Sequence, residues 1–356
     1  MATSKWGWLT TTGRFAVLCA CVFALAPQLS GQQERTARIR GYIVEVKSST
    51  EFTLDDYRID RDRQYHIDLD LPPGVVDQAI AVGSEVELDG ILGEREGSFR
   101  AAAFRKLRAP LDRTPPTTTI ATPTPLERGE RGLINSMRIR VKEPVYEKRR
   151  SGGVLMGQRT TFEVLPNAEI QRYIDELGWS LVPEFQRNLA SGDPARIPFR
   201  FYVIKTADAG ASALPNGVVM VYQGMFEVLQ NESQLASIVA HEISHVIQKH
   251  MWKLSYMPES VIKTDYRRAF ENQADRQALS FMLAASYDPR EASKTWRLMA
   301  RKLGFSPLRG SHENYAMRRA FMMHELDVAY RDLDYTGLKK EEARYTDIAA
   351  RVKKPY

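Results

Sequence analysis

The sequence predicts an α+β fold in which a small all-β, OB-like barrel precedes a larger, mostly helical domain. Three observations carry this prediction. Short alternating segments separated by glycines fill residues 35–108, which is typical of a small barrel. Residues 109–132 are rich in proline, threonine and charge, which indicates an extended linker. Apolar residues then recur at helical spacing within residues 133–330, so this region is expected to have its own core.

Residues 1–31 have the pattern of a signal peptide. Lys5 and Arg14 precede an apolar run from Phe15 to Ala26, and no acidic residue occurs before Glu34. The run is short for a membrane-spanning helix. We therefore expect an exported protein, either periplasmic or secreted.

The chain has two cysteines, Cys19 and Cys21, and both lie in this segment. A mature chain then has no disulfide, and neither a nucleophile nor a metal ligand can be cysteine. The surrounding residues resemble a weak lipobox, so a lipid anchor at Cys21 and an uncleaved signal anchor stay open as alternatives. The formal charge of +6 falls by two without Lys5 and Arg14. Such a surplus suits peripheral membrane association and is too diffuse to indicate nucleic-acid binding.

The barrel is predicted from five short strands. The first is an alternating run from Ile39 to Val46, and the others cover residues 52–54, 65–69, 85–92 and 98–107. Small barrels can bind nucleic acid, but stacking aromatic residues are sparse here and the strands carry many acids. A protein-binding or spacing role is therefore expected, with an inert barrel as the alternative.

Beyond the linker, the apolar spacing predicts a helix capped by Asn167 and strands at residues 197–204 and 218–222. The segment 133–157 has no clear pattern, and an arm that packs over the domain is one interpretation. Residues 331–356 are expected to be a charged tail with a solvated helix.

Two further helices carry most of the polar motifs. Asn231 followed by Gln234 resembles a capping box, and it predicts a buried helix that runs on toward His250. His250, in the last turn, is expected to cap that helix or to be solvated. A second helix is predicted from Asp265 to about Ser286, with small residues that allow close approach to a neighbour.

The most informative motif is His241-Glu242-Ile243-Ser244-His245 on the first of these two helices. Positions i and i+4 share one helix face, so two imidazoles can bind one metal ion. A carboxylate beside them can act as general base toward a metal-bound water. The pattern indicates one zinc ion per chain.

A third ligand is expected from the second helix. Glu271 and Asp275 lie four residues apart and share a face. One carboxylate can bind the metal, and the other can hold a ligand imidazole in place. The alternative is that both only solvate the helix or pair with nearby arginines, which are Arg267, Arg268 and Arg276.

The motifs occur in the order of a known family, and they resemble the gluzincin metallopeptidases grouped with HtpX and the CAAX prenyl proteases. The residues that carry the resemblance are Leu214-Pro215-Asn216-Gly217, strand 218–222, Glu232 to His250, Glu271-x-x-Ala274-Asp275, Tyr287-Asp288-Pro289, and Ser311-His312 with Arg318. It covers roughly residues 160–325 and implies a zincin-like metallopeptidase domain within residues 133–330. Ser286 stands where the family has glycine, and Glu313 stands where it has proline.

The resemblance also implies roles. His241, His245 and Glu271 would be the zinc ligands, Asp275 would lie behind them, and Glu242 would be the general base and later the proton donor. His312 would stabilise the oxyanion or position the substrate. Gly217, Val218, Val219 and Arg318 are expected to contact substrate. Strand 218–222 would do so as an edge strand that pairs with an extended peptide, with an ordinary interior strand as the alternative.

The sequence therefore predicts an exported zinc endopeptidase that acts on protein or peptide substrates, misfolded exported proteins among them. The alternative is a non-catalytic or chaperone-like module that retains the metal fold. Glu242 speaks against it, because a residue set that only holds zinc needs no base. A nucleic-acid-binding barrel with an attached helical domain has the least support.

Overall fold

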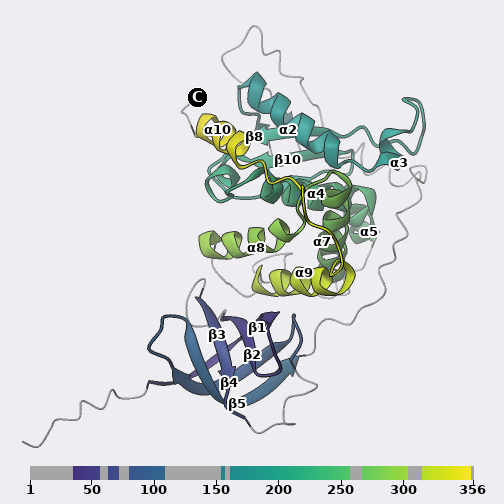
Figure 1. Ribbon diagram of the computed structural model, residues 1–356. Helices are drawn as coiled ribbons and strands as arrows, with labels where there is room; N and C mark the ends of the chain where they lie inside the picture. The colour runs from purple at the N-terminus through teal and green to yellow at the C-terminus, as the bar shows by residue number, and fades with distance from the viewer. Residues whose placement is uncertain are drawn as a thin grey trace, which may run out of the picture. The chain divides into compact units, whose positions relative to one another are not determined.

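The structure is a computed structural model that describes residues 35–56, 63–71, 80–108, 154–156, 161–256, 267–303 and 315–353 (Figure 1). The predicted signal peptide, the predicted linker and His312 lie outside these ranges. Within them, no helix combines the length and the hydropathy needed to cross a membrane.

Five strands form a closed barrel. They are β1 (Thr36–Val46), β2 (Glu51–Asp56), β3 (Arg63–Leu69), β4 (Glu85–Leu92) and β5 (Ser98–Arg108). Their order around the barrel is β1-β2-β3-β5-β4, and β4 closes back onto β1. Strands β3 and β5 run parallel, whereas the other neighbours run antiparallel. The predicted barrel is confirmed, and its closure pairs every strand on both sides.

The region after the barrel contains a three-stranded sheet. It consists of β8 (Arg200–Ile204), β9 (Ala211–Ala213) and β10 (Val218–Tyr222). Strand β10 is in the middle, parallel to β8 and antiparallel to β9. Alternate residues point to opposite faces, so Phe201 and Val219 join the main core while Tyr202 and Met220 join a smaller cluster. A separate antiparallel pair is formed by β6 (Val154–Met156) and β7 (Thr161–Glu163).

The described chain also contains helices. They are α2 (Ala168–Leu181), α3 (Glu184–Arg187), the 3-10 helix η1 (Gln223–Glu227), α4 (Glu232–Ile247), α5 (His250–Tyr256), α7 (Arg267–Ala284), α8 (Arg290–Leu303), α9 (Tyr315–Ala329) and α10 (Glu342–Val352). Helices α2 and α4 lie beside the three-stranded sheet (Figure 1) and share a core with it. Asn167 caps α2 as predicted, because its Oδ1 accepts hydrogen bonds from the backbone N–H of Glu169 and Ile170.

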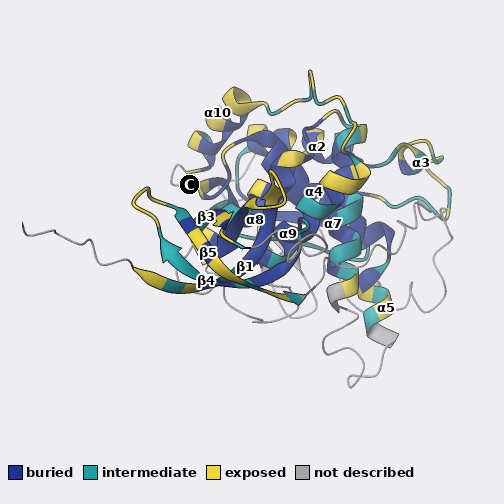
Figure 2. Cartoon of the chain, turned by 60° about the horizontal axis from the view of Figure 1, so that its bottom comes forward, coloured by how far each residue is buried: buried dark blue, intermediate teal, exposed yellow. Residues whose placement is uncertain are grey.

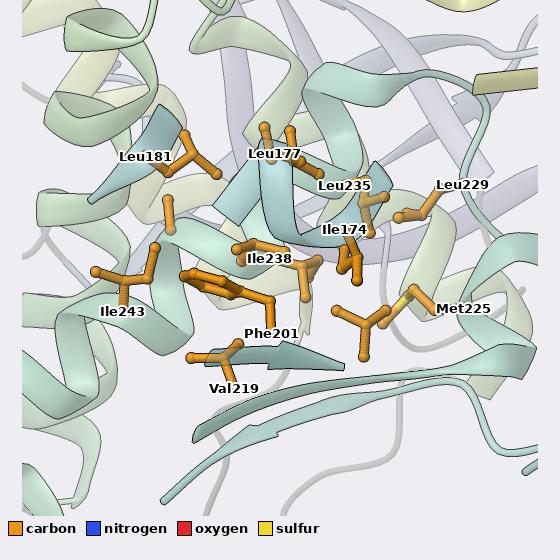
Figure 3. Packing of buried hydrophobic residues seen from close by; sticks show 14 of the residues in the cluster. Ile174, Leu177, Leu181, Phe201, Val219, Met225, Leu229, Leu235, Ile238 and Ile243 are labelled. Carbon is orange, nitrogen blue, oxygen red and sulfur yellow. The ribbon is translucent and has the colours of Figure 1, made fainter. Parts of the chain in front are cut away.

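Helix α4 is almost wholly buried. Its residues are buried apart from Glu242 and His245, which are partly exposed. Leu235 and Ile238 meet side chains of α2 and the sheet residue Phe201 (Figure 3). Burial of one such aliphatic side chain contributes about 1.5–3 kcal/mol. The helix that carries the H-E-x-x-H motif is therefore fixed by packing on most of its surface.

The N-terminus of α4 agrees with the predicted cap, with one difference. Asn231 Oδ1 accepts a hydrogen bond from Gln234 N at 2.9 Å. The Gln234 side chain does not return to Asn231 as in a capping box, and instead accepts from Gln230 N at 2.7 Å. The start of the helix is therefore predicted correctly from local residues.

The predicted charged tail needs a correction. Its helix exists as α10, but Tyr345, Ile348, Ala349 and Val352 are buried and belong to the main core. Figure 2 shows both exposed and buried residues on this helix. The Tyr345 ring stacks on Phe226 with centroids 5.9 Å apart. The helix is therefore amphipathic and packed, since its apolar residues recur at helical spacing between the charges.

Helix α9 contacts barrel strands. Ala316 and Ala320 form a small buried cluster with Tyr42 of β1. Arg319 forms a buried ion pair with Asp55 of β2. Arg319 follows Arg318 in sequence, and Arg318 points to the polar centre described next.

Candidate metal centre

Helices α4 and α7 bring the three predicted ligands together. His241 and His245 come from α4 and Glu271 from α7, and one ligand atom of each lies within 4.8 Å of the others. The two Nε2 atoms are 2.9 Å apart. Glu271 Oε2 lies 3.3 Å from His241 Nε2, and Glu271 Oε1 lies 3.6 Å from His245 Nε2. This cluster could hold a metal ion.

Asp275 lies behind His241, one helical turn beyond Glu271 on α7. Its Oδ1 is 2.9 Å from His241 Nδ1, and both side chains are buried. In the neutral ring, a hydrogen on Nδ1 bonded to this carboxylate leaves the Nε2 lone pair on the side of Glu271 and His245. Burial and Arg318 oppose a charge on His241, but Asp275 outweighs them and raises the pKa of His241 to about 9.

Arg318 of α9 completes this side of the centre. Its Nη2 and Nε donate to the two Asp275 oxygens at 2.6 and 2.9 Å, and its Nη1 lies 3.3 Å from Glu271 Oε2. The guanidinium also lies over the Trp296 ring, 3.5 Å from its centroid. Burial opposes the charge, but Asp275 and Glu271 raise the pKa of Arg318. The arginine therefore neutralises part of the buried negative charge.

Arg318 was expected to contact substrate, but in the structure its side chain is buried. The side chain is only 2% exposed, and its described polar contacts are with His241, Glu271 and Asp275. Arg276 was one of the arginines considered as partners for the α7 carboxylates. Arg276 pairs with Glu325 of α9 at 3.2 Å.

His245 contacts His250, which in turn contacts Gln273, and these groups differ from the ones that contact His241. His250 Nδ1 lies 2.9 Å from His245 Nδ1, and His250 Nε2 lies 3.0 Å from Gln273 Oε1 of α7. The expectation that His250 caps α4 or is solvated is wrong, because α4 ends at Ile247 and His250 begins α5 with 1% exposure. Burial lowers the pKa of His250 to about 4. Burial, followed by the nearby His241, also lowers the pKa of His245.

Glu242 occupies the partly exposed position of α4 between the two histidines in sequence. The helix is covered elsewhere, so this residue and His245 mark the part of α4 that solvent and a substrate can reach. His312, the other residue expected to act in catalysis, lies outside the described residues.

A small pocket opens beside His245. It is lined by Ala213, Leu214 and Pro215 after β9, by His245 and Val246 of α4, by Lys249, and by Met251 and Trp252 of α5. Most of these side chains are apolar. The end of β9 therefore borders the metal cluster.

The expected substrate contacts of Gly217, Val218 and Val219 need a correction. Val218 and Val219 are 0% exposed, and β10 is hydrogen-bonded to strands on both sides. A peptide cannot add to an interior strand, so the alternative of an ordinary interior strand is the right one. Gly217 adopts φ 88° in the turn from β9 to β10, and an added Cβ would lie 2.8 Å from Ile197 Cγ2. Its role there is conformational.

The exposed edge of this sheet belongs to β9. Leu214 N donates to Val218 O, and Gly210 O accepts from Tyr222 N, so these two residues face β10. In an antiparallel pair the alternate residues, Ala211 and Ala213, direct their N–H and C=O groups to the other side. No strand in the described ranges pairs there. The sequence did not reveal this edge, because three small residues carry no strand pattern.

The donor set fits a catalytic zinc ion. Two imidazole nitrogens and one carboxylate oxygen are common zinc ligands, and three protein ligands leave a fourth position for water or substrate. The hydrogen bond of Asp275 to His241 matches the carboxylate–histidine arrangement that usually supports such ligands.

Comparison with protein families agrees with this geometry. Residues 167–261 match the model of Peptidase family M48. The match contains His241, Glu242 and His245 and ends before Glu271. Residues 167–261 are thus similar to Peptidase family M48, and this similarity agrees with the fold and with the metal cluster. The finer grouping with HtpX and the CAAX prenyl proteases stays a prediction.

Individual relatives are similar to part of this chain. The beta-barrel assembly-enhancing proteases of Yersinia pestis and Escherichia coli (strain K12) are 39% and 38% identical over 82 residues, which are 23% of this chain and 15% of theirs. The mitochondrial metalloendopeptidase OMA1 of Arabidopsis thaliana is 23% identical over 168 residues, 38% of this chain and 34% of its own. The chain therefore matches about a third or less of the length of each of these relatives.

Proposed function

We propose that this protein is an exported zinc-dependent endopeptidase. The observation that carries the proposal is the cluster of His241, His245 and Glu271 with Glu242 beside it on the partly exposed part of α4. A zinc ion held by this cluster would lower the pKa of a bound water and polarise a scissile carbonyl.

The chain's own residues would do the remaining work. Glu242 would accept a proton from the attacking water and return it to the leaving amine. Asp275 would keep the proton of His241 on Nδ1, and Arg318 would offset the charge of Asp275 and Glu271. His312 is proposed to stabilise the oxyanion or to position the substrate.

The substrate would bind as an added strand along β9. The outward N–H and C=O groups of Ala211 and Ala213 offer main-chain hydrogen bonds to an extended peptide. The apolar pocket beside His245 would take one substrate side chain. Recognition through the main chain suits protein substrates of varied sequence, such as misfolded exported proteins.

Further parts of the proposal come from the amino-terminal pattern and from relatives. The signal-peptide pattern supports a periplasmic or secreted location. Relatives whose names refer to beta-barrel assembly make proteins of that process a reasonable first substrate set. The barrel of residues 35–108 is proposed to bind protein or to act as a spacer.

The decisive test is Glu242→Gln in the mature, zinc-loaded chain. Cleavage of casein or of an unfolded exported protein should fall to background, while zinc content and thermal unfolding stay as in wild type. Glu227→Gln on η1 changes an exposed carboxylate in the same way and should leave cleavage intact. Unchanged cleavage by Glu242→Gln would sink the peptidase assignment. Binding of unfolded protein without any cleavage by wild type would favour the chaperone-like alternative.

The third ligand has its own test. Glu271→Ala should lower zinc affinity by about one to two orders of magnitude or more, since a ligand is lost. Full zinc occupancy in this variant at limiting zinc would move the third ligand elsewhere.

Strand addition along β9 is tested by Ala213→Pro. Proline removes an outward N–H without touching the hydrogen bonds to β10, so kcat/KM for protein substrates should fall about tenfold or more. Ala213→Val adds bulk but keeps the N–H, and it should retain most activity. Equal loss in both variants would point to a steric effect instead.

A further inference from the structure

We infer that His250 is a positioning residue that, together with Gln273, fixes the tautomer and the ring orientation of His245. The inference rests on the proposed zinc site and concerns residues that lie behind it. The juxtaposition of three side chains from α4, α5 and α7 carries it.

The chain turns sharply between α4 and α5, and this turn places the side chain of His250 next to that of His245. Helix α4 ends at Ile247, and Lys249 adopts φ 56°, in the left-handed region that residues with a side chain seldom occupy. This turn starts α5 at His250 instead of continuing α4. A continuous helix would have moved the two rings apart around its axis, since five residues do not return to the same face. The turn therefore brings the two Nδ1 atoms within 2.9 Å.

The direction of the hydrogen bonds follows from Gln273. Its Oε1 can only accept, so the hydrogen of a neutral His250 lies on Nε2, 3.0 Å away. His250 Nδ1 then carries a lone pair and accepts from His245 Nδ1–H. The lone pair of His245 is left on Nε2, the atom that faces His241 and Glu271. These two hydrogen bonds together therefore leave the lone pair of His245 Nε2 directed toward the metal cluster.

The ring of His250 is held in place by its surroundings. It stacks on Phe270 of α7 with centroids 4.4 Å apart and an interplanar angle of 12°. Its side chain is almost wholly buried, so water does not compete for its nitrogens. His245 and His250 meet edge to face, with centroids 4.9 Å apart. Stacking and burial therefore restrict the imidazole to the orientation that the hydrogen bonds need.

The test measures zinc affinity by competition with a chelator, and it needs no proteolysis. His250→Phe keeps a ring for stacking but has no acceptor, so zinc affinity should fall about 10- to 100-fold. His250→Asn puts an amide oxygen near the position of Nδ1, and it should restore affinity to within about threefold of wild type. Gln273→Leu should resemble His250→Phe in direction. Gln277→Leu is the matched control, because Gln277 also joins α7 to α4, through Ser244 Oγ at 2.7 Å.

A spectroscopic readout separates positioning from general damage. In the metal-free protein, nitrogen-15 NMR should find the hydrogen of His245 on Nδ1, and His250→Phe should shift it partly to Nε2. Wild-type zinc affinity in His250→Phe, an equal loss in Gln277→Leu, or His245 protonated on Nε2 in wild type would each overturn the inference. The proposed function fails separately, if wild type binds no zinc or if Glu242→Gln still cleaves.

Discussion

The two histidines of α4 that we propose as zinc ligands lie four residues apart, yet they contact different kinds of groups on the side away from the metal cluster. His241 is backed by a buried charged pair, Asp275 with Arg318. His245 is backed by neutral groups, His250 and Gln273. Both arrangements leave an Nε2 lone pair for the metal, but only the first brings formal charge into the centre.

The difference teaches how such a centre limits buried negative charge. Glu271 and Asp275 are both carboxylates, and Arg318 is close enough to both to compensate for one of them. A second carboxylate behind His245 would add another buried charge, which is costly without its own partner. A neutral imidazole–amide pair fixes the same tautomer without this cost.

The largest effect is expected from removing the charge of Arg318. We call Asp275 and Arg318, beside His241, the charged side of the centre, and His250 and Gln273, beside His245, its neutral side. Arg318→Met leaves two buried carboxylates without their cation, which should lower the free energy of unfolding by about 3–5 kcal/mol. His250→Phe removes one neutral hydrogen-bond partner and should cost only about 1–2 kcal/mol. Urea unfolding of both variants with excess chelator measures the difference. Equal losses would show that the two sides are energetically alike.

The next effect concerns metal affinity on the charged side. Asp275→Asn removes the charge and weakens the hold on His241, so zinc affinity should fall about 10- to 100-fold. Titration with zinc in a competing chelator measures this fall. Retention of wild-type affinity would mean that the carboxylate acts only on folding.

The charged side should also make metal-free stability depend on pH. The folded pKa of His241 is raised to about 9, above its ordinary value of 6.5, chiefly because Asp275 outweighs burial and Arg318. The extra stability is therefore complete below about pH 6.5 and is lost as the pH rises toward 9. Unfolding of the metal-free protein across this range should show the decline, and Asp275→Asn should flatten it. A decline of the same size in that variant would assign the proton to another group.

The smallest effect on the free energy of unfolding is expected from a substitution just after α7, the helix that supplies residues to both sides of the centre. Ser286, at a position where the family that the motifs resemble has glycine, lies two residues after the end of α7 and adopts φ 64°. Ser286→Gly relieves this conformation and should raise the free energy of unfolding by about 0.5–1 kcal/mol. Helix α7 supplies Glu271, Gln273 and Asp275, so the ratio between the effects on the two sides should not change. A stability unchanged or lowered by the glycine would mean that Ser286 makes compensating contacts.

Much of the fold follows from local patterns. The five barrel strands, strand β10, and the caps at Asn167 and Asn231 lie where alternation and capping residues predict them. The i, i+4 spacing predicted that His241 and His245 share one helix face, and the family resemblance singled out Glu271 as the third ligand. These three residues lie together in the structure. The similarity to the model of Peptidase family M48 covers residues 167–261.

Other features depended on how distant segments meet. Strand order made β10 an interior strand and left the short β9 at the edge, and no periodicity within Val218–Tyr222 contains that order. The sequence by itself determined which residues could be zinc ligands and which helices carry them, because helical spacing is a property of the local backbone. Only the tertiary structure decided which side chains contact each histidine on the side away from the metal cluster. Arg318 and His250 reach their histidines through packing between helices, where burial and hydrogen bonding across the chain outweigh local pattern.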